Sequence, residues 1–384
     1  NMKIIRIAEK ELLSLSKQYR AIAVVGPRQS GKTTLVRGVF PEKVYVNLEN
    51  TDTRRFAIED PRGFLSGFPD GAILDEVQRV PELFSYLQQI LDENTTKGQF
   101  ILTGSNNFLL QENISQTLAG RVGYMFLLPL SLHELNQPLP STDELIHRGL
   151  YPELNDGEQM DAAKYYSNYI STYVERDVRL IKNIVDLYAF ERFVRLCAGR
   201  TGQLLNMNSL AIETGVDNKT IASWLSVLET SFIVFRLQPY HKNYNKRIVK
   251  MPKLYFYDTG LASALLGIEN KEQLSLHPFR GALFENMVVL EFLKNRFNHG
   301  KTNNLFFWRD NVGTEIDLLI EYTERLVPIE IKSGQTITDA YFKSLTTWCK
   351  ITGIDTGYVI YAGNQTQKRS NGITVLPYTS TNFF

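Results

Sequence analysis

The sequence predicts an α/β protein built from several successive units. Three observations predict this class: short apolar strands alternate with amphipathic helical segments over residues 21–130, strand signals vanish in the next stretch, and a second mixed pattern follows residue 270. The length of 384 residues also exceeds the roughly 150 residues of a typical domain. We therefore expect more than one core.

The composition is that of an ordinary globular protein. Hydrophobic residues make up 43% and charged residues 22%, which excludes collagen-like, mucin-like and disordered classes. The net charge of +1 gives no global attraction to nucleic acid or membrane, so any basic surface must be local. Only two cysteines occur, and no CxxC or HExxH pattern supports a disulfide scaffold or a zinc site. No apolar run approaches the ~20 residues that span a bilayer, so we expect a cytoplasmic protein without a membrane partner.

Four units are expected along the chain. Residues 1–130 carry the strands of a parallel sheet, and residues 131–199 are helical, with Tyr165, Tyr166 and Tyr169 at the spacing of a core-facing helix stripe. Residues 200–270 show two helices around a Gly-Val-Asp turn and then a two-stranded ribbon, the order of a winged helix-turn-helix. Residues 271–384 follow the order αβββαββ.

A phosphate-binding loop follows the first strand. The strand Ala21–Val25 runs into GPRQSGKTT, which matches GxxxxGK[ST] completely and precedes a helical segment. The two glycines let backbone N–H groups curl around phosphates, the lysine neutralises their charge and the first threonine coordinates Mg²⁺. A structural glycine-rich turn has no need of Lys and Thr in those places. The predicted ATP-binding residues are Gly26, Pro27, Arg28, Gln29, Ser30, Gly31, Lys32, Thr33 and Thr34.

An acidic pair, Asp75 and Glu76, ends the buried strand 72–74. Placing two carboxylates at the end of a buried strand costs free energy unless they interact with a cation. We therefore assign Asp75 to the Mg²⁺ ligand shell and Glu76 to polarising the attacking water. The alternative is a solvated pair of loop carboxylates. If the strand 44–48 inserts between the phosphate-loop strand and this acidic strand, the order is that of P-loop ATPases with a catalytic glutamate.

Two further catalytic candidates follow. Ser105 or Asn106, after the strand 100–103, could hold the hydrolytic water, and the sequence does not choose between them. Arg121 is a candidate for contacting the γ-phosphate in cis or from a neighbouring subunit. A surface or domain-docking ion pair explains a single arginine equally well.

At this point the chain resembles a prokaryotic family of AAA-type ATPases with a C-terminal domain of unknown function that is similar to PD-(D/E)XK nucleases. The resemblance covers nearly the whole length and rests on GPRQSGKTT, VNLEN, AILDEVQRVPELF, ILTGSNNFLL, LAGRVGYMFLLPLSLHEL, TYVERDV, PKLYFYDTGLA, RGALFEN, EIDLLI and PIEIKSG in that order. It implies a P-loop ATPase sheet, a helical and winged-helix middle and a nuclease-like end. It implies no particular substrate.

The predicted ribbon is basic. Between Arg236 and Lys253 there are six Lys or Arg residues and no Asp or Glu, interleaved with aromatic side chains. A wing of this kind can follow a phosphate backbone with salt-sensitive, largely sequence-independent affinity. The alternative is docking onto an acidic face of another domain. The candidate DNA-binding residues are Lys242, Lys246, Arg247 and Lys250.

A second acidic constellation lies near the C-terminus. Asp317, Glu330 and Lys332 fit the D-x₁₂-ExK spacing, and a hairpin turning at residues 322–325 places Ile320 opposite Val327 and Asp317 opposite Glu330. The functional interpretation is a Mg²⁺ site in which Asp317 and Glu330 hold metal, Lys332 orients water and Glu285 supports the shell. The alternative is a nuclease fold used only for binding, with an inert charge network.

Three functions are compatible with these features. The leading hypothesis is a Mg²⁺-dependent ATP hydrolase whose nucleotide state controls a module that associates with double-stranded DNA. The second is a signalling or scaffold protein in which ATP is a switch and the C-terminal domain binds a protein partner. The third is a metal-dependent DNA endonuclease regulated by ATP. The sequence leaves the oligomeric state open.

Overall fold

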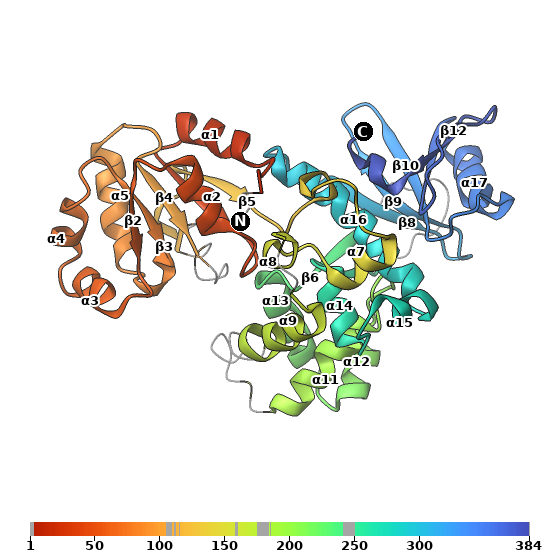
Figure 1. Cartoon of the computed structure of the whole chain (residues 1–384), viewed down its shortest axis with the longest axis horizontal. Coiled ribbons are helices and arrows are strands. Elements are labelled where there is room, and N and C mark those ends of the chain that lie inside the picture. The colour runs from red at the N-terminus through yellow and green to blue at the C-terminus, as the bar shows by residue number, and fades with distance from the viewer. Residues whose placement is uncertain are drawn as a thin grey trace.

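The computed structural model describes residues 4–104, 110, 113–114, 116–157, 160–174, 184, 186–240 and 250–383. In Figure 1 the N-terminal sheet and its helices lie at the left, the helical region lies at the lower centre and the C-terminal sheet lies at the upper right. The predicted fold class is confirmed: a parallel α/β sheet is followed by helices and then by a mixed sheet.

The N-terminal sheet has five strands, all parallel to their neighbours, in the order β2-β3-β4-β1-β5. The strands are β1 (Ala21–Val25), β2 (Val44–Asn47), β3 (Ala72–Asp75), β4 (Phe100–Thr103) and β5 (Val122–Phe126). The helices are α1 (Glu9–Gln18), α2 (Lys32–Val39), α3 (Thr51–Glu59), α4 (Pro61–Ser66), the 3₁₀ turn η1 (Val77–Arg79) and α5 (Leu83–Glu93).

β4 lies between β1 and β3 in the sheet. From the sequence, the strand at residues 44–48 was the candidate for this position. β2 instead forms an edge of the sheet. The reason lies in burial: every residue of β4 is buried, as a central parallel strand requires, whereas Val44 at the start of β2 is exposed. One strand therefore does separate the phosphate-loop strand from the acidic strand.

Both faces of this sheet are covered. Alternate residues of β1 point to opposite faces, so Ala21, Ala23 and Val25 join the core under α3, α4 and α5, and Ile22 and Val24 join the core under α1 and α2. All five residues of β1 are buried in consequence. This burial fixes the position of the loop that follows the strand.

The next stretch is helical, as predicted. Its elements are η2 (Leu132–Glu134), α7 (Thr142–Arg148), α8 (Pro152–Asn155), α9 (Ala162–Tyr169), the π-helical turn η3 (Ile170–Val174) and α11 (Leu187–Ala198). Tyr165, Tyr166 and Tyr169 of α9 are buried in one hydrophobic cluster, so the expected core role of the tyrosine stripe is confirmed.

The two expected helices of the third unit are α12 (Met207–Thr214) and α13 (Asn218–Thr230), and Gly215 ends α12 in the left-handed conformation with φ 78°. The ribbon of β6 (Val234–Pro239) and β7 (Lys253–Phe256) is antiparallel. It is not a free wing, because β6 also pairs in parallel with β8 (Leu305–Arg309) and so joins the C-terminal sheet. That sheet crosses the unit boundary expected at residue 270.

The eight-stranded C-terminal sheet has the order β12-β13-β11-β10-β9-β8-β6-β7. Its remaining strands are β9 (Glu315–Glu321), β10 (Leu326–Lys332), β11 (Gly357–Tyr361), β12 (Gln367–Lys368) and β13 (Ile373–Pro377). The helices are α14 (Thr259–Leu265), α15 (Lys271–Leu276), α16 (Arg280–Asn298), η4 (Asp339–Phe342), α17 (Lys343–Thr352) and η5 (Tyr378–Phe383). The predicted hairpin register is confirmed, since Ile320 pairs with Val327.

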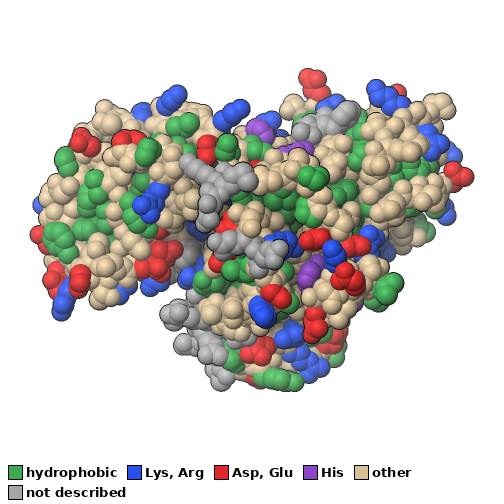
Figure 2. Space-filling view, viewed as in Figure 1, with side chains coloured by type: hydrophobic (Ala, Val, Ile, Leu, Met, Phe, Trp, Pro, Cys, Tyr) green, Lys and Arg blue, Asp and Glu red, His purple; other side chains and the backbone are tan. Residues whose placement is uncertain are grey.

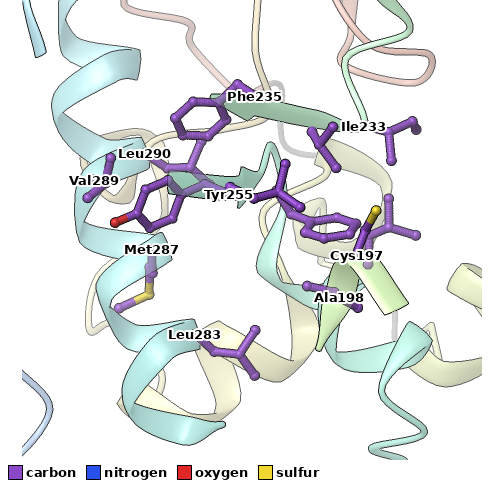
Figure 3. Packing of buried hydrophobic residues seen from close by; sticks show 14 of the residues in the cluster. Cys197, Ala198, Ile233, Phe235, Tyr255, Leu283, Met287, Val289 and Leu290 are labelled. Atoms are coloured by element: carbon purple, nitrogen blue, oxygen red, sulfur yellow. The ribbon is translucent and has the colours of Figure 1, made fainter. Parts of the chain in front are cut away.

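A single hydrophobic cluster joins the helical region to the C-terminal sheet. Figure 3 shows Phe235 and Tyr255 of the β6–β7 ribbon beside Leu290 of α16, with Cys197 of α11 on the other side. The ribbon is therefore embedded in a core by its apolar residues. Within the described part of the chain, no helix has the length and apolarity to cross a bilayer.

Candidate functional site

The phosphate loop lies at the carboxyl end of β1 and leads into α2. A Cβ at Gly26 would clash with the backbone carbonyl oxygen of Leu127, so the close approach of these two backbones requires glycine. Gly31, at the N-cap of α2, has φ 88°, a backbone conformation that residues with a side chain rarely adopt. The two glycines thus fix the loop geometry at the helix N-terminus, where backbone N–H groups can bind an anion.

Lys32 is buried beneath this loop. Its Nζ donates hydrogen bonds to the carbonyl oxygens of Gly26 (2.9 Å) and Pro27 (2.6 Å). Burial lowers the pKa of Lys32 to about 8, although the nearby carboxylates of Glu76 and Asp75 oppose this shift. A buried ammonium in this place is well suited to an anionic ligand.

Asp75, at the end of β3, links the phosphate loop to its neighbouring strands. Its Oδ2 accepts hydrogen bonds from Thr33 Oγ1 (3.0 Å) and from the Tyr45 hydroxyl of β2 (2.6 Å), and its Oδ1 accepts one from Thr103 of β4. Tyr45 and Thr103 are site residues that were not among those predicted from the sequence. Both could have been predicted, because the carboxyl ends of parallel strands meet at one edge of a sheet and polar side chains there can reach Asp75.

Glu76 follows Asp75 in a left-handed conformation with φ 57°, which is unusual for a residue with a side chain. Gln78 Nε2 donates a hydrogen bond of 2.6 Å to Glu76 Oε2. Such backbone outliers persist only where the surroundings hold them, and they concentrate at functional sites. Gln78 is a third residue that the sequence does not indicate, because its buried position beside Glu76 has no local signal.

Gly31, Lys32, Asp75 and Glu76 line one cavity of about 590 Å³. That volume lies within the range of small-molecule sites. The N-terminal segment and the helical region contribute to its wall through Ile4, Arg6, Glu9, Leu130, Pro152, Glu153, Asp156 and Tyr173. The predicted residues that line it are Arg28, Gln29, Gly31, Lys32, Thr33, Thr34, Asp75 and Glu76.

Arg6 also holds the phosphate loop in place, a role that the sequence does not indicate. Its guanidinium donates to the backbone oxygens of Ser30 and Leu128, both at 2.8 Å, and pairs with Glu134 at 3.0 Å. Arg6 is buried together with its partner. The N-terminal segment, the phosphate loop and the start of the helical region are thereby tied at one point.

The structure corrects the prediction for Arg121. Arg121 precedes β5, and its backbone oxygen accepts from Ala21 N at the start of β1, whereas the phosphate loop lies at the other end of β1. Its guanidinium pairs instead with Asp92, with Nε 2.6 Å from Oδ1. The cis role is therefore wrong, and the trans role stays a prediction. Ser105 and Asn106 lie outside the described residues.

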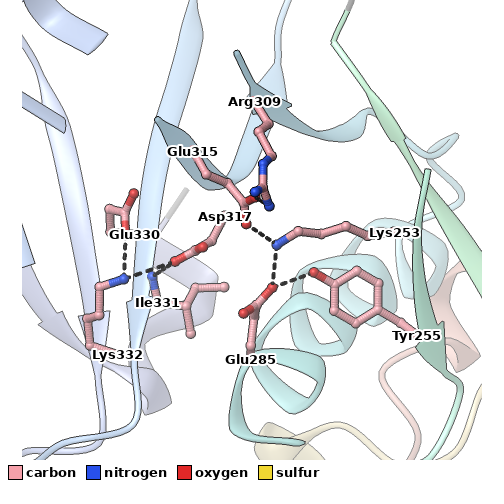
Figure 4. A network of polar contacts seen from close by, with 9 residues as sticks. All are labelled: Lys253, Tyr255, Glu285, Arg309, Glu315, Asp317, Glu330, Ile331 and Lys332. Carbon is pink, nitrogen blue, oxygen red and sulfur yellow. Dashed lines mark hydrogen bonds and ion pairs between the residues drawn. The ribbon is translucent and has the colours of Figure 1, made fainter. Parts of the chain in front are cut away.

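The second predicted constellation centres on a lysine that the prediction had placed on the basic ribbon. Lys253 of β7 is buried, and its Nζ pairs with Glu285 of α16 at 3.0 Å and with Glu315 of β9 (Figure 4). The Tyr255 hydroxyl donates to the same Glu285 oxygen at 2.5 Å. Burial alone would lower the pKa of Lys253, but Tyr255 and the surrounding carboxylates raise it well above its ordinary value.

Lys332 forms ion pairs with the other two carboxylates of this constellation. Its Nζ lies 2.6 Å from Glu330 Oε2 and 3.4 Å from Asp317 Oδ2. Burial, followed by the charge of Asp317, raises the pKa of Glu330 well above its ordinary value. Burial alone would raise the pKa of Asp317, but the charges of Lys332 and Lys253 and hydrogen bonds lower it below its ordinary value.

These carboxylates do not fit a divalent ion as they stand. Lys253 and Lys332 already form ion pairs with them, and a group of three or more His, Cys, Asp or Glu side chains suited to a metal does not occur in the part of the chain that the structure describes. The expected shell of Glu285, Asp317 and Glu330 is therefore an ion-pair network. The sequence does not indicate these ion pairs, because Lys253 is remote along the chain from Glu285 and Glu315.

The basic ribbon is smaller than predicted. Arg236 pairs with Glu229 of α13, with Nε 2.6 Å from Oε1, and Lys253 is buried. Lys250 is exposed, and Lys242, Lys246 and Arg247 lie outside the described residues. On the face shown in Figure 2, Lys and Arg side chains are interspersed with Asp and Glu, in keeping with the net charge of +1.

Comparisons with known proteins bear on this site. An uncharacterized protein of Mycobacterium tuberculosis and one of Mycobacterium bovis are each 31% identical to this chain over 360 residues, which cover 93% of this chain and 79% of theirs. The chain belongs to the family of these mycobacterial proteins.

Three domain families match successive parts of this chain. Residues 18–136 match an AAA domain, residues 139–272 match a domain of unknown function, DUF8612, and residues 280–381 match a second one, DUF4143. Among solved structures, the Walker-type ATPase of Pyrococcus abyssi aligns with a TM-score of 0.43 and 14% identity, covering 68% of this chain and 96% of that one. The AAA match and the phosphate-loop geometry support ATP binding by the N-terminal domain.

Proposed function

We propose that this protein is a Mg²⁺-dependent ATP hydrolase. The observation that carries the proposal is the hydrogen bond between Thr33 of the phosphate loop and Asp75 of β3, in the cavity that also holds Lys32 and Glu76. A hydroxyl and a carboxylate held together beside a buried lysine are the groups that a nucleotide with its magnesium ion requires. The AAA domain match over residues 18–136 supports the same proposal.

Each residue has a distinct role in this proposal. Lys32 neutralises the phosphate charge, and Thr33 and Asp75 would hold Mg²⁺, which when bound offsets charge on the phosphate oxygens. Glu76 polarises the attacking water, and the Gln78 amide holds the Glu76 carboxylate in place. The backbone N–H groups of residues 26–34 bind the phosphates. Ser105 or Asn106 remains our candidate for holding the water.

We further propose that hydrolysis is coupled to association with double-stranded DNA. The support is the exposed Lys250 and the run of Lys242, Lys246 and Arg247 that precedes it without an acidic residue. In this proposal residues 1–130 form the ATPase unit and residues 131–199, 200–270 and 271–384 form the coupled module. The ion pairs of Lys253 and Lys332 favour a binding-only C-terminal domain, which is also what a switch or scaffold requires.

Phosphate release with and without duplex DNA tests the proposal. We expect Mg²⁺-dependent release that duplex DNA accelerates and that Lys32→Ala abolishes. Slow release that DNA leaves unchanged would favour the switch, in which bound ATP and not its turnover carries the signal. Nicking of the same DNA, followed on a gel, would support the endonuclease that the ion-pair network argues against.

A further inference from the structure

The phosphate loop contacts the helical region directly. Tyr165 of α9 donates its hydroxyl proton to Gln29 Oε1 at 2.5 Å, and Gln29 Nε2 donates to the Tyr173 hydroxyl of η3 at 3.2 Å. The guanidinium carbon of Arg28 lies 4.9 Å from the centre of the Tyr173 ring. Two adjacent loop residues are therefore held by tyrosines more than 130 positions away.

These contacts hold a strained part of the loop. Gln29 has φ 60°, a conformation that costs free energy for any residue with a side chain. Both ends of its amide are engaged, one accepting and one donating, which fixes its orientation. Burial raises the pKa of Tyr165 far above its ordinary value, so this tyrosine keeps its proton and remains a donor at any physiological pH.

The tyrosines themselves are firmly placed. The rings of Tyr165 and Tyr166 pack edge to face with centroids 5.1 Å apart, and the Tyr166 hydroxyl donates to Asp258 Oδ1 at 2.6 Å. Asp258 also accepts from Leu261 N at the start of α14. Tyr173 lies in a π-helical turn that continues α9, and such turns are frequent at functional sites.

We propose that Tyr165 and Tyr173 are positioning residues for the phosphate loop, so that the helical region controls the affinity for ATP. This rests on the proposed ATP binding. Without the two hydroxyls, the Gln29 backbone can leave its strained conformation and shift the neighbouring N–H groups away from the phosphates. The reverse also follows, because coupling between two sites is reciprocal: ATP should stabilise α9.

Tyr165→Phe tests this with the smallest change, since the ring stays in the core and only the hydroxyl is lost. Tyr151→Phe is a matched control, because the Tyr151 hydroxyl bonds to Tyr169 at 3.0 Å within the same cluster. We expect Tyr165→Phe and Gln29→Ala each to weaken ATP affinity about threefold to tenfold, the effect of one hydrogen bond. Combining them should add little, whereas Tyr151→Phe should bind ATP like wild type.

The readouts separate positioning from general stability. Titration of ATP well below the melting temperature gives the dissociation constant, and steady-state hydrolysis gives KM and kcat, of which KM should change more. Hydrogen exchange of residues 162–169 should slow on adding ATP in wild type and not in Gln29→Ala. Equal ATP affinity in wild type, Tyr165→Phe and Gln29→Ala would overturn the inference. Absence of ATP binding by wild type would instead overturn the proposed function.

Discussion

Thr33 Oγ1 lies 3.0 Å from Asp75 Oδ2, although 42 residues separate the two positions in the chain. The contact joins the first turn of α2 to the end of β3 across the intervening strand β4. Tyr45 and Thr103 donate to the same carboxylate from β2 and β4. Asp75 is thus the point at which three strands and the phosphate loop meet.

Replacing Asp75 with asparagine should lower the rate of ATP hydrolysis by about 10–100-fold, because the amide keeps the shape of the side chain but removes the charge that would help to hold Mg²⁺. Tyr45→Phe is the control, since it removes one donor and leaves the carboxylate charged. Phosphate release measured against Mg²⁺ concentration checks both. The assignment of Asp75 fails if the two variants have the same dependence on Mg²⁺.

Lys32→Ala and Glu76→Gln should differ in kind. The first removes the positive charge that a bound phosphate needs, so ATP binding should be lost; the second keeps that charge and should bind ATP but hydrolyse it poorly. Glu82→Gln makes the same chemical change at an exposed position and should behave like wild type. Equilibrium binding of labelled ATP, with phosphate release on the same samples, checks the prediction. Unchanged affinity in Lys32→Ala would rule out the phosphate-loop role.

Much of the fold could be predicted because local patterns determine it. The strand Ala21–Val25, the glycines at 26 and 31 and the register of Ile320 with Val327 all follow from alternation, turn chemistry and spacing. The place of β2 in the sheet could not be predicted, because strand order depends on tertiary burial and not on order along the chain.

The errors in the sites have the same origin. Lys253 was expected on an exposed basic ribbon, but the pairing of β6 with β8 turns the ribbon into the core and brings Lys253 to Glu285. For Arg121 the sequence leaves a nucleotide contact and an ion pair equally open, and the structure shows the ion pair with Asp92, at the end of β1 away from the loop. Long-range contacts of this kind leave no local signal.

Lys253→Met should destabilise the protein by about 3–5 kcal/mol, because it leaves the half-buried Glu285 without its cation and leaves Glu315 with Arg309 alone. Adding Glu285→Gln should recover part of the loss, since one unpaired charge is then removed. Urea unfolding followed by circular dichroism gives the free energies of unfolding. A loss below about 1 kcal/mol would show that the pair is not a buried ion pair of this kind.

The same network predicts the response to metal. In a Lys32→Ala background, which removes the nucleotide site, Mn²⁺ should not raise the melting temperature through Asp317, because Lys253 and Lys332 already occupy the carboxylates as ion-pair partners. The measurement compares melting with Mn²⁺ in Lys32→Ala and in Lys32→Ala with Asp317→Ala. A stabilisation by Mn²⁺ that disappears with Asp317 would restore the metal site expected from the D-x₁₂-ExK spacing.

Reversing Lys246, Arg247 and Lys250 to glutamate should weaken duplex DNA binding across unrelated sequences and flatten its dependence on salt, because these cations would displace counterions from the phosphates. Reversal of Lys10, Lys17 and Lys97, which are exposed on the N-terminal domain, changes the net charge equally and serves as the control. Fluorescence anisotropy at several salt concentrations provides the measurement. Equal weakening by both sets would attribute binding to net charge alone.

The most direct test of the ATP hydrolase is the identity of the nucleotide that the protein holds after a single turnover. Wild-type protein and Glu76→Gln are each mixed in excess with labelled ATP and Mg²⁺, and the bound nucleotide is separated by chromatography at successive times. We predict that wild type converts bound ATP to ADP while Glu76→Gln retains ATP, because only the latter lacks the carboxylate that polarises water. Conversion at the same rate in both proteins, or bound ATP that wild type never hydrolyses, would contradict the account.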